Sequence, residues 1–230
     1  IDIARESTIK NLGLIDVDIT SDSFGTLANN VWGATVEECY STGSIKGSAN
    51  RMGGLIGILQ DWLSKQASIK NCYSTCSVEN TNTGESYTGG FVGNAGYTLS
   101  VDTLENCYSV GIVTAAYTAG AGGFAGYKTG LSTITNCFYD STTSGQSDTG
   151  KGVPETTAQM QLEATYTGWD FDTVWDIDPA INDGYPYLKV FVNEEIPTIY
   201  QFTYGSGTEA DPYQVWTADD LNGVRDYLDA

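Results

Sequence analysis

Apolar and polar residues alternate in short phrases that recur along the first two thirds of the chain. Four phrases end in cysteine and an aromatic residue: Val36-Glu37-Glu38-Cys39-Tyr40, Ile69-Lys70-Asn71-Cys72-Tyr73, Leu104-Glu105-Asn106-Cys107-Tyr108 and Ile134-Thr135-Asn136-Cys137-Phe138. A weaker copy, Ile9-Lys10-Asn11-Leu12-Gly13, precedes them. The fourth position falls at residues 12, 39, 72, 107 and 137, so the intervals are 27, 33, 35 and 30 residues. A period in this range is typical of a solenoid or another repeat array.

Glycine-bracketed apolar phrases alternate with the cysteine phrases. They read Gly53-Gly54-Leu55-Ile56-Gly57, Gly89-Gly90-Phe91-Val92-Gly93 and Gly122-Gly123-Phe124-Ala125-Gly126. Each is too short for a helix, and its glycines permit a tight corner or the close approach of a neighbouring coil. We therefore expect several short strands in each repeat.

Together the two phrases predict an all-β fold, a parallel β-solenoid of about five rungs over residues 1–150. In a regular strand Ile69 and Cys72 would face opposite ways, so we expect a bend or bulge between them that turns both inward. Equivalent positions should then stack into a core ladder. Its expected members are Cys39, Cys72, Cys107, Cys137, Ile69, Leu104, Ile134, Leu55, Phe91 and Phe124. Aromatic residues that follow the cysteines should form a further column, in the core or on a face.

The alternation of Asn-Cys-Tyr-Ser-x-Gly with Gly-Gly-Leu/Phe-Val-Gly over residues 8–145 resembles the GLUG repeat of large bacterial and archaeal surface proteins. Those proteins include adhesins and the non-catalytic regions of immunoglobulin A peptidases. The first copy departs from the pattern at Leu12, and Cys76 stands where the neighbouring repeats have Gly43 and Gly111. The resemblance implies a parallel β-solenoid with a cell-surface role and without catalytic residues.

The repeat pattern stops near residue 150. Thr156 and Gln159 have the spacing of a capping box that opens a short helix. Residues 151–190 are rich in Trp, Phe and Tyr, and we expect them to bury these side chains as a mixed cap over the last rung.

The remainder of the chain has a different composition. Residues 191–203 are predicted to be a connector, and residues 204–230 resemble the start of a following repeat domain and contain a short terminal helix. Four residues of that helix are candidates for docking on the first rung of a tandem domain or of another copy: Leu221, Val224, Tyr227 and Leu228.

The charge of the chain excludes some partners. Its 230 residues carry 29 acidic and 10 basic side chains, a formal net charge of −19. Such a surface repels nucleic acid and anionic lipid, so we expect neither as a partner. No apolar run is long enough to span a membrane, and because the chain begins at Ile1 inside a predicted strand we expect it to be part of a longer protein. An extracellular or cell-surface location is the interpretation that this composition favours.

Histidine is absent from the chain, which excludes Ser-His-Asp and Cys-His catalysis and every imidazole metal site. The remaining enzymatic alternative is a β-helix polysaccharide lyase or hydrolase that uses carboxylates. The acids in the middle of the repeats are Glu79, Glu85, Asp102 and Glu105. They occupy different positions of the repeat, so no catalytic pair is expected.

Two further groups are candidate sites. Five carboxylates follow one another closely and would suit calcium: Asp170, Asp172, Asp176, Asp178 and Asp183. Solvated acids that alternate with buried aromatic residues are the alternative, and no other cofactor is expected. The five cysteines are either buried reduced thiols, a disulfide framework or a metal set, and we favour buried thiols because only Cys72 and Cys76 are close in sequence.

These observations favour a non-enzymatic surface domain, an adhesin stalk or a structural filament whose partners are tandem domains or other copies joined head to tail. A carbohydrate-binding module that accompanies a secreted enzyme and takes surface glycans is the alternative.

Overall fold

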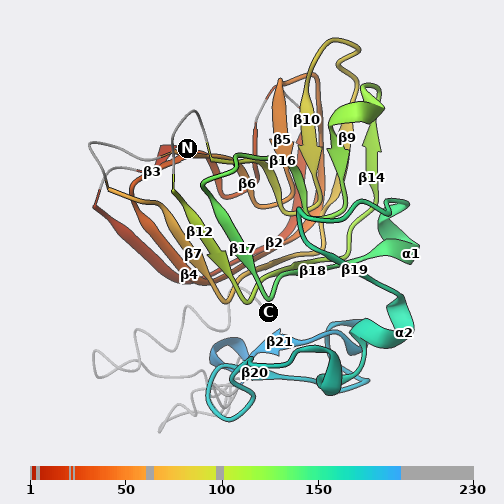
Figure 1. Ribbon diagram of the computed structural model, residues 1–230. Coiled ribbons are helices and arrows are strands. Elements are labelled where there is room, and N and C mark those ends of the chain that lie inside the picture. Colours follow the sequence, from red (N-terminus) through yellow and green to blue (C-terminus); the bar gives the residue numbers. More distant parts are fainter. Residues whose placement is uncertain are drawn as a thin grey trace, which may run out of the picture. The chain divides into compact units, whose positions relative to one another are not determined.

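The computed structural model describes residues 2–3, 6–20, 22, 24–60, 65–96 and 101–192 (Figure 1). The chain divides into two compact units, Ile1–Lys189 and Val190–Ala230. All strands of the described residues belong to the first unit.

The largest sheet has 11 strands, all of its pairs parallel. Two 13-residue strands, β2 (Thr8–Thr20) and β4 (Thr35–Gly47), pair along most of their length. In later repeats the equivalent of β4 is broken into shorter strands. These are β7 (Ser68–Lys70), β8 (Tyr73–Ser74), β9 (Ser77–Asn80), β12 (Thr103–Glu105), β13 (Tyr108–Ser109), β14 (Val113–Ala115), β17 (Thr133–Thr135), β18 (Phe138–Asp140) and β19 (Val153–Glu155).

Two further parallel sheets complete the repeats. One contains β1 (Asp2–Ile3), β3 (Ala28–Trp32), β6 (Ile56–Gln60), β11 (Val92–Ala95) and β16 (Ala125–Lys128). The other contains β5 (Arg51–Gly53), β10 (Tyr87–Gly89) and β15 (Ala121–Gly122). The antiparallel pair β20 (Trp175–Asp176) and β21 (Tyr187–Leu188) stands apart from these sheets. The helices are short: α1 (Ser141–Ser144), α2 (Thr157–Met160) and the 3-10 turns η1 (Thr118–Gly120), η2 (Glu163–Thr165), η3 (Asn182–Gly184) and η4 (Lys189–Phe191). The mostly β, parallel architecture agrees with the sequence prediction.

Equivalent residues of successive repeats lie directly opposite one another. In the first strand of each repeat the paired residues are Ile9, Val36, Ile69, Leu104 and Ile134. On the other face of the same strands Lys10, Glu37, Lys70 and Glu105 are paired, and salt bridges join Lys10 to Glu37 at 3.3 Å and Lys70 to Glu105 at 3.7 Å. The parallel register therefore stacks apolar residues inside and opposite charges outside.

A sharp corner follows the first three or four residues of the strand in β2 and β4, and it separates the first two short strands of each later repeat. It falls on the residue before the cysteine, and this residue has a left-handed backbone, with φ between 49° and 55° at Asn11, Glu38, Asn71, Asn106 and Asn136. Asparagine tolerates this conformation better than most residues. The left-handed residue reverses the alternation of the strand, which is how both Ile69 and Cys72 are buried.

The glycine phrases lie where the chain crosses between the sheets. A Cβ on Gly90 would overlap the carbonyl oxygen of Gly123 in the next repeat. Ser109 donates a hydrogen bond of 2.8 Å to that same carbonyl oxygen. Only glycine permits this approach of two backbones, so the phrase is needed for packing.

The expected ladder residues lie in the main hydrophobic core. Cys39, Cys72, Cys107, Cys137, Ile69, Leu104, Leu55, Phe91 and Phe124 are buried there. Ile134 is partly buried and packs against it. A second, smaller core contains Ile45, Ala49, Met52 and Val78.

The last repeat is covered by residues that directly follow it. The hydroxyl of Tyr139 donates to the carbonyl oxygen of Asp148 at 2.7 Å, and the Asp148 carboxylate accepts from the backbone of Gly123 at 2.9 Å. Lys151 Nζ donates to the carbonyl oxygen of Gly126 at 2.7 Å. The aromatic segment, which we expect over this end, instead packs against the side of the largest sheet, where Trp175 contacts Tyr73 and Tyr108.

The position of the aromatic segment at the side of the largest sheet has a physical reason. Tyr40, Tyr73 and Tyr108 stack with ring centroids 4.8 and 5.1 Å apart, and Phe138 continues the column. Such a column leaves a wide apolar surface on the outside of the sheet, which the aromatic segment removes from water.

Candidate functional site

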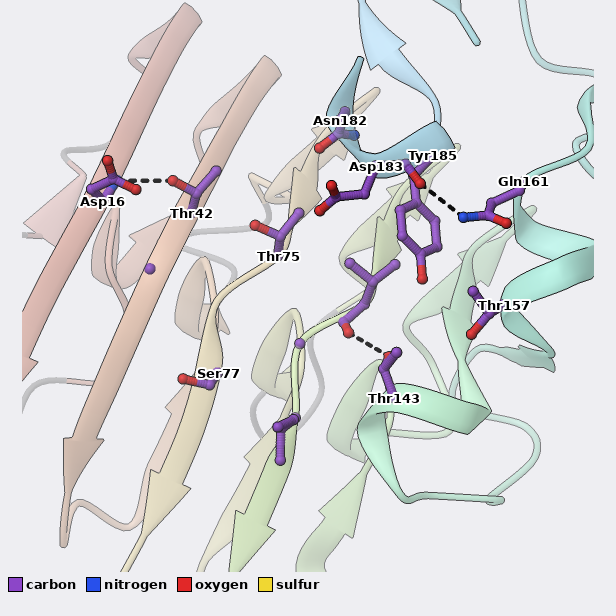
Figure 2. Close-up of a pocket in the computed structure, with 14 residues that line it drawn as sticks. Asp16, Thr42, Thr75, Ser77, Thr143, Thr157, Gln161, Asn182, Asp183 and Tyr185 are labelled. Atoms are coloured by element: carbon purple, nitrogen blue, oxygen red, sulfur yellow. Dashed lines mark hydrogen bonds between the residues drawn. The ribbon is translucent and has the colours of Figure 1, made fainter. Parts of the chain in front are cut away.

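A groove of about 720 Å³ lies between the largest sheet and the aromatic segment. Its floor crosses successive repeats, at Asp16, Thr42, Thr75, Val110 and Thr143. Figure 2 shows Asp16, Thr42, Thr75 and Thr143 following one another in this order, the last of them on a helix. Its wall comes from the aromatic segment and its preceding helix, at Thr157, Gln161, Asn182, Asp183 and Tyr185. This volume is in the range of ligand sites in proteins.

The floor is built from one position of the repeat. The pairs Ser41–Ser74 and Ser74–Ser109 are in register, so the residues that follow them, Thr42, Thr75 and Val110, lie in one row. The backbone N–H of Asp16 donates to Oγ1 of Thr42 at 2.8 Å, which places the Asp16 side chain at one end of this row. Asp16 has φ of 52° at an irregularity in the pairing of β2 with β4.

The wall is held by a turn with two successive left-handed residues, Asn182 and Asp183, with φ of 49° and 54°. Asn182 Nδ2 donates to the Tyr108 hydroxyl at 2.7 Å and to the carbonyl oxygen of Pro186 at 2.8 Å. Gln161 Nε2 donates to the carbonyl oxygen of Asp183 at 2.8 Å. Figure 2 shows the carboxylate of Asp183 directed towards the floor. Consecutive left-handed residues other than glycine are costly, so the surrounding contacts must fix this turn.

Asp140 joins the wall to the repeats. This buried carboxylate accepts hydrogen bonds from the backbone of Thr142 and Thr143 at the start of α1, and from the hydroxyls of Thr157 and Tyr185 at 2.6 and 2.7 Å. Burial, followed by the hydrogen bond to Asp140, raises the pKa of Tyr185 well above its ordinary value. Tyr185 therefore remains a protonated donor at neutral pH.

The aromatic segment contacts the tyrosine column directly. The ring of Trp175 lies 6.1 Å from the rings of both Tyr73 and Tyr108. Its Nε1 donates to Oδ1 of Asn71 at 3.4 Å, and Nε1 of Trp169 donates to the carbonyl oxygen of Asn136 at 3.1 Å. These contacts fix the distance between the floor and the wall of the groove.

The five candidate calcium ligands do not converge. The carboxylate of Asp170 accepts three hydrogen bonds from Asp172 and Thr173 of its own turn. Asp176 and Asp178 accept from nearby backbone N–H groups, whereas Asp183 lines the groove. Within the ranges that the structure describes, no group of three or more His, Cys, Asp or Glu side chains could hold a metal ion. The calcium interpretation is therefore not supported by the geometry.

The cysteines are all buried, and none forms a disulfide. Cys72 Sγ accepts a hydrogen bond from the backbone of Cys39 at 3.4 Å, so the thiols follow one another across the repeats. The hydrogen bond to Cys72 and then burial raise the pKa of Cys39, and burial raises the pKa of Cys72 and Cys107. The extra cysteine, Cys76, is also inside and donates to the hydroxyl of Ser41 at 3.4 Å.

The acids considered for polysaccharide cleavage are separate from one another. Glu79 pairs with Lys46 at 2.6 Å, and Glu105 pairs with Lys70. Asp102 is buried and accepts from the backbone of Ala67 at 2.8 Å, and Glu85 accepts from the Tyr87 hydroxyl at 2.7 Å. Among the described residues each of these four acids has a partner other than a second acid of the four, and none of them lines the groove.

Leu221, Val224, Tyr227 and Leu228, the docking candidates, lie outside the described residues. The sequence analysis missed the floor of the groove. A signal was present, because Thr42 and Thr75 both stand three residues after a ladder cysteine. The sequence singled out Asp183 as a possible calcium ligand and not as part of a groove.

Comparison with known proteins gives two similarities, and the chain matches no protein-family model. Over 162 residues, 69% of the chain, it is 36% identical to a protein of Evansella cellulosilytica named "Putative Gly-rich membrane protein". The chain spans 14% of the length of that relative.

The second similarity is to a crystal structure of "a putative immunoglobulin A1 protease from Bacteroides ovatus". It covers 80% of this chain and 75% of that chain, with a TM-score of 0.50 and 18% sequence identity. At this identity the similarity concerns the fold alone. It agrees with the expected link to immunoglobulin A peptidase regions, whereas the GLUG assignment stays a prediction.

In the part of the chain that the structure describes, no helix has the length and apolar character of a membrane span.

Proposed function

We propose that this chain is a parallel β-solenoid of about five rungs that serves as a non-enzymatic structural domain of an extracellular or cell-surface protein, such as an adhesin stalk. The observation that carries the proposal is the common register of equivalent residues from Ile9 to Ile134. In such a stack each repeat contacts only its neighbours, so a stalk can be lengthened by adding repeats. The much greater length of the Evansella relative is consistent with this use.

The non-enzymatic part of the proposal is supported by the local contacts of Glu79, Glu85, Asp102 and Glu105, which leave no carboxylate pair among them. No cofactor is proposed, because the carboxylates of Asp170, Asp176 and Asp178 hold their own turns.

The partner that we propose is another solenoid unit, either a tandem domain or a second copy, stacked on β2. Among the described strands β2 pairs only with β4, so its other edge is open. It also carries two exposed apolar side chains, Leu12 with 38% and Ile15 with 66% of their surface accessible. An open, partly apolar edge is a template for a further strand, and identical copies joined this way would form an open filament.

The location can be tested with an antibody against the folded chain, applied to intact and to permeabilised cells of the source organism. We expect intact cells to be labelled and external protease to remove the label. Labelling only after permeabilisation would refute the surface location.

Stacking on β2 can be tested by light scattering over a range of concentrations. We expect the mass to rise with concentration, and Ile15→Lys to keep the chain monomeric. Ile112→Lys is the matched control, since Ile112 is 58% exposed and belongs to no strand. A wild-type chain that is monomeric at every concentration would contradict self-stacking.

A carbohydrate-binding role is a second candidate, and the groove is the observation that favours it.

A further inference from the structure

The groove has the form of a site for an extended polymer. Its floor row, Asp16, Thr42, Thr75, Val110 and Thr143, crosses successive repeats. Parallel strands are spaced by about 4.8 Å, so the row runs along the stacking direction with one side chain for each repeat, at or just after a strand for Asp16, Thr42, Thr75 and Val110, and in α1 for Thr143. This spacing is close to the length of one pyranose unit, so a sugar chain lying along the groove would meet one floor residue per unit.

The charge of the lining selects the kind of sugar. Of the 14 lining residues, Asp16 and Asp183 are carboxylates and none is Lys or Arg. The whole chain carries a net charge of −19. Sugars that bear carboxylate, sulfate or phosphate groups are therefore repelled, whereas a cationic sugar is attracted.

The two carboxylates are available to a ligand. Neither Asp16 nor Asp183 accepts a hydrogen bond through its side chain from any residue that the structure describes. Both side chains are attached to left-handed backbone that neighbouring contacts hold in place. Both residues are exposed, so a ligand can reach their carboxylates, and charge-assisted hydrogen bonds to a carboxylate are stronger than those between neutral groups.

The rest of the floor suits the other faces of a sugar. The hydroxyls of Thr75 and Ser77 also make no hydrogen bond to a described residue, and they can pair with sugar hydroxyls. Ile112 is 58% exposed beside them and can pack against the C–H face of a ring.

We propose that the groove binds an oligosaccharide of amino sugars with free amines, whose ammonium groups lie against Asp16 and Asp183 and whose hydroxyls meet Thr75 and Ser77. This inference rests on the carbohydrate-binding candidate and narrows it to one class of ligand.

The test is isothermal titration calorimetry of the full chain with three probes: a hexamer of β-1,4-linked glucosamine, the fully N-acetylated hexamer and an oligogalacturonate. We expect the glucosamine hexamer to bind, the N-acetylated hexamer to bind at least about tenfold more weakly, and the oligogalacturonate not to bind.

Asp183→Asn is the key variant, because asparagine accepts the left-handed backbone and the fold is kept. It should weaken glucosamine binding by about tenfold or more. Asp178→Asn is the matched control, since it removes the same charge from an exposed residue that does not line the groove. Circular dichroism should show both variants folded.

Each alternative outcome has a clear meaning. Equal weakening by Asp178→Asn and Asp183→Asn would show general charge attraction and overturn the proposed site. Equal binding of the amine and N-acetylated hexamers would overturn the amine preference while leaving a glycan site in place. No binding of any probe would overturn both the inference and the carbohydrate-binding candidate.

Discussion

The hydroxyl of Tyr185 donates a 2.7 Å hydrogen bond to Oδ2 of Asp140, across 45 positions of sequence. This bond ties the wall of the groove to β18, a strand of the last repeat. Oδ1 of the same carboxylate accepts hydrogen bonds from the first backbone N–H groups of α1. A single side chain therefore supports both the wall of the groove and the start of α1.

We predict that Asp140→Ala destabilises the protein by about 3 kcal/mol, because a helix cap and two hydrogen bonds to a buried carboxylate are lost together. Urea denaturation followed by tryptophan fluorescence measures this free energy. Asp172→Ala, at an exposed acid of the aromatic segment, should change it by less than about 0.5 kcal/mol. Equal effects of the two variants would contradict the role of Asp140.

At the crossing between sheets we predict that Gly90→Ala lowers stability by about 1–3 kcal/mol, since the new Cβ must displace the backbone of Gly123. Gly130→Ala provides the comparison, because no atom lies within 4 Å of its added Cβ. Thermal unfolding by circular dichroism distinguishes them, and a Gly90→Ala protein that melts like the wild type would show that the crossing can widen.

Two substitutions at the left-handed corner residue are predicted to change the stability of the protein in opposite directions. Asn106→Ala should destabilise the protein by about 1 kcal/mol, because alanine lacks the tolerance of asparagine for positive φ. Glu38→Asn should stabilise it by up to about 1 kcal/mol, since asparagine suits positive φ and the lost ion pair is partly solvated through Lys10, whose side chain is 44% exposed. Denaturation midpoints test both changes. Destabilisation by Glu38→Asn would mean that the ion pair outweighs the backbone preference.

Alkaline pH should destabilise the fold. The folded-state pKa of Cys72, Cys107, Tyr73 and Tyr108 is raised, mainly by burial. Below the pKa that these groups have in the unfolded chain, they are protonated and neutral in both states. Their contribution to the stability of the fold is therefore fully present at such pH. Above about pH 9 the unfolded chain loses protons that the folded chain keeps, and stability falls as pH rises further. Urea midpoints between about pH 7 and about pH 11 should show this decline.

The thiols should be unreactive until the protein unfolds. Thiolate is the reacting form, and burial with a raised pKa keeps Cys39, Cys72 and Cys107 protonated and shielded. A chromogenic disulfide reagent should therefore label these cysteines slowly in buffer, and all five thiols in denaturant. A count of one in denaturant would mean two disulfides and would contradict the buried-thiol interpretation.

Sequence spacing was enough to predict the parallel β architecture, because each repeat carries the same apolar and glycine positions. The corner could not be located, since the alternation of Ile69 and Cys72 shows that a bend is needed but not which residue adopts it. The aromatic segment was expected at the end of the stack. Composition shows that Trp175 must be buried but not against which surface, and its partner Asn71 lies 104 residues away. The groove was missed for the same reason, since Asp16 and Asp183 line one groove only after that packing.

The alternating charges Lys10, Glu37, Lys70 and Glu105 have a consequence for how the stack is assembled. Similar repeats can mispair when one of them is looped out during folding. Omitting the second repeat would set Lys10 against Lys70, and omitting the third would set Glu37 against Glu105. Like charges directly opposite one another are destabilising in a sheet. The row of alternating charges thus disfavours a stack from which a repeat has been omitted. Only when all repeats are stacked in order does each of these charged residues lie beside one of opposite sign.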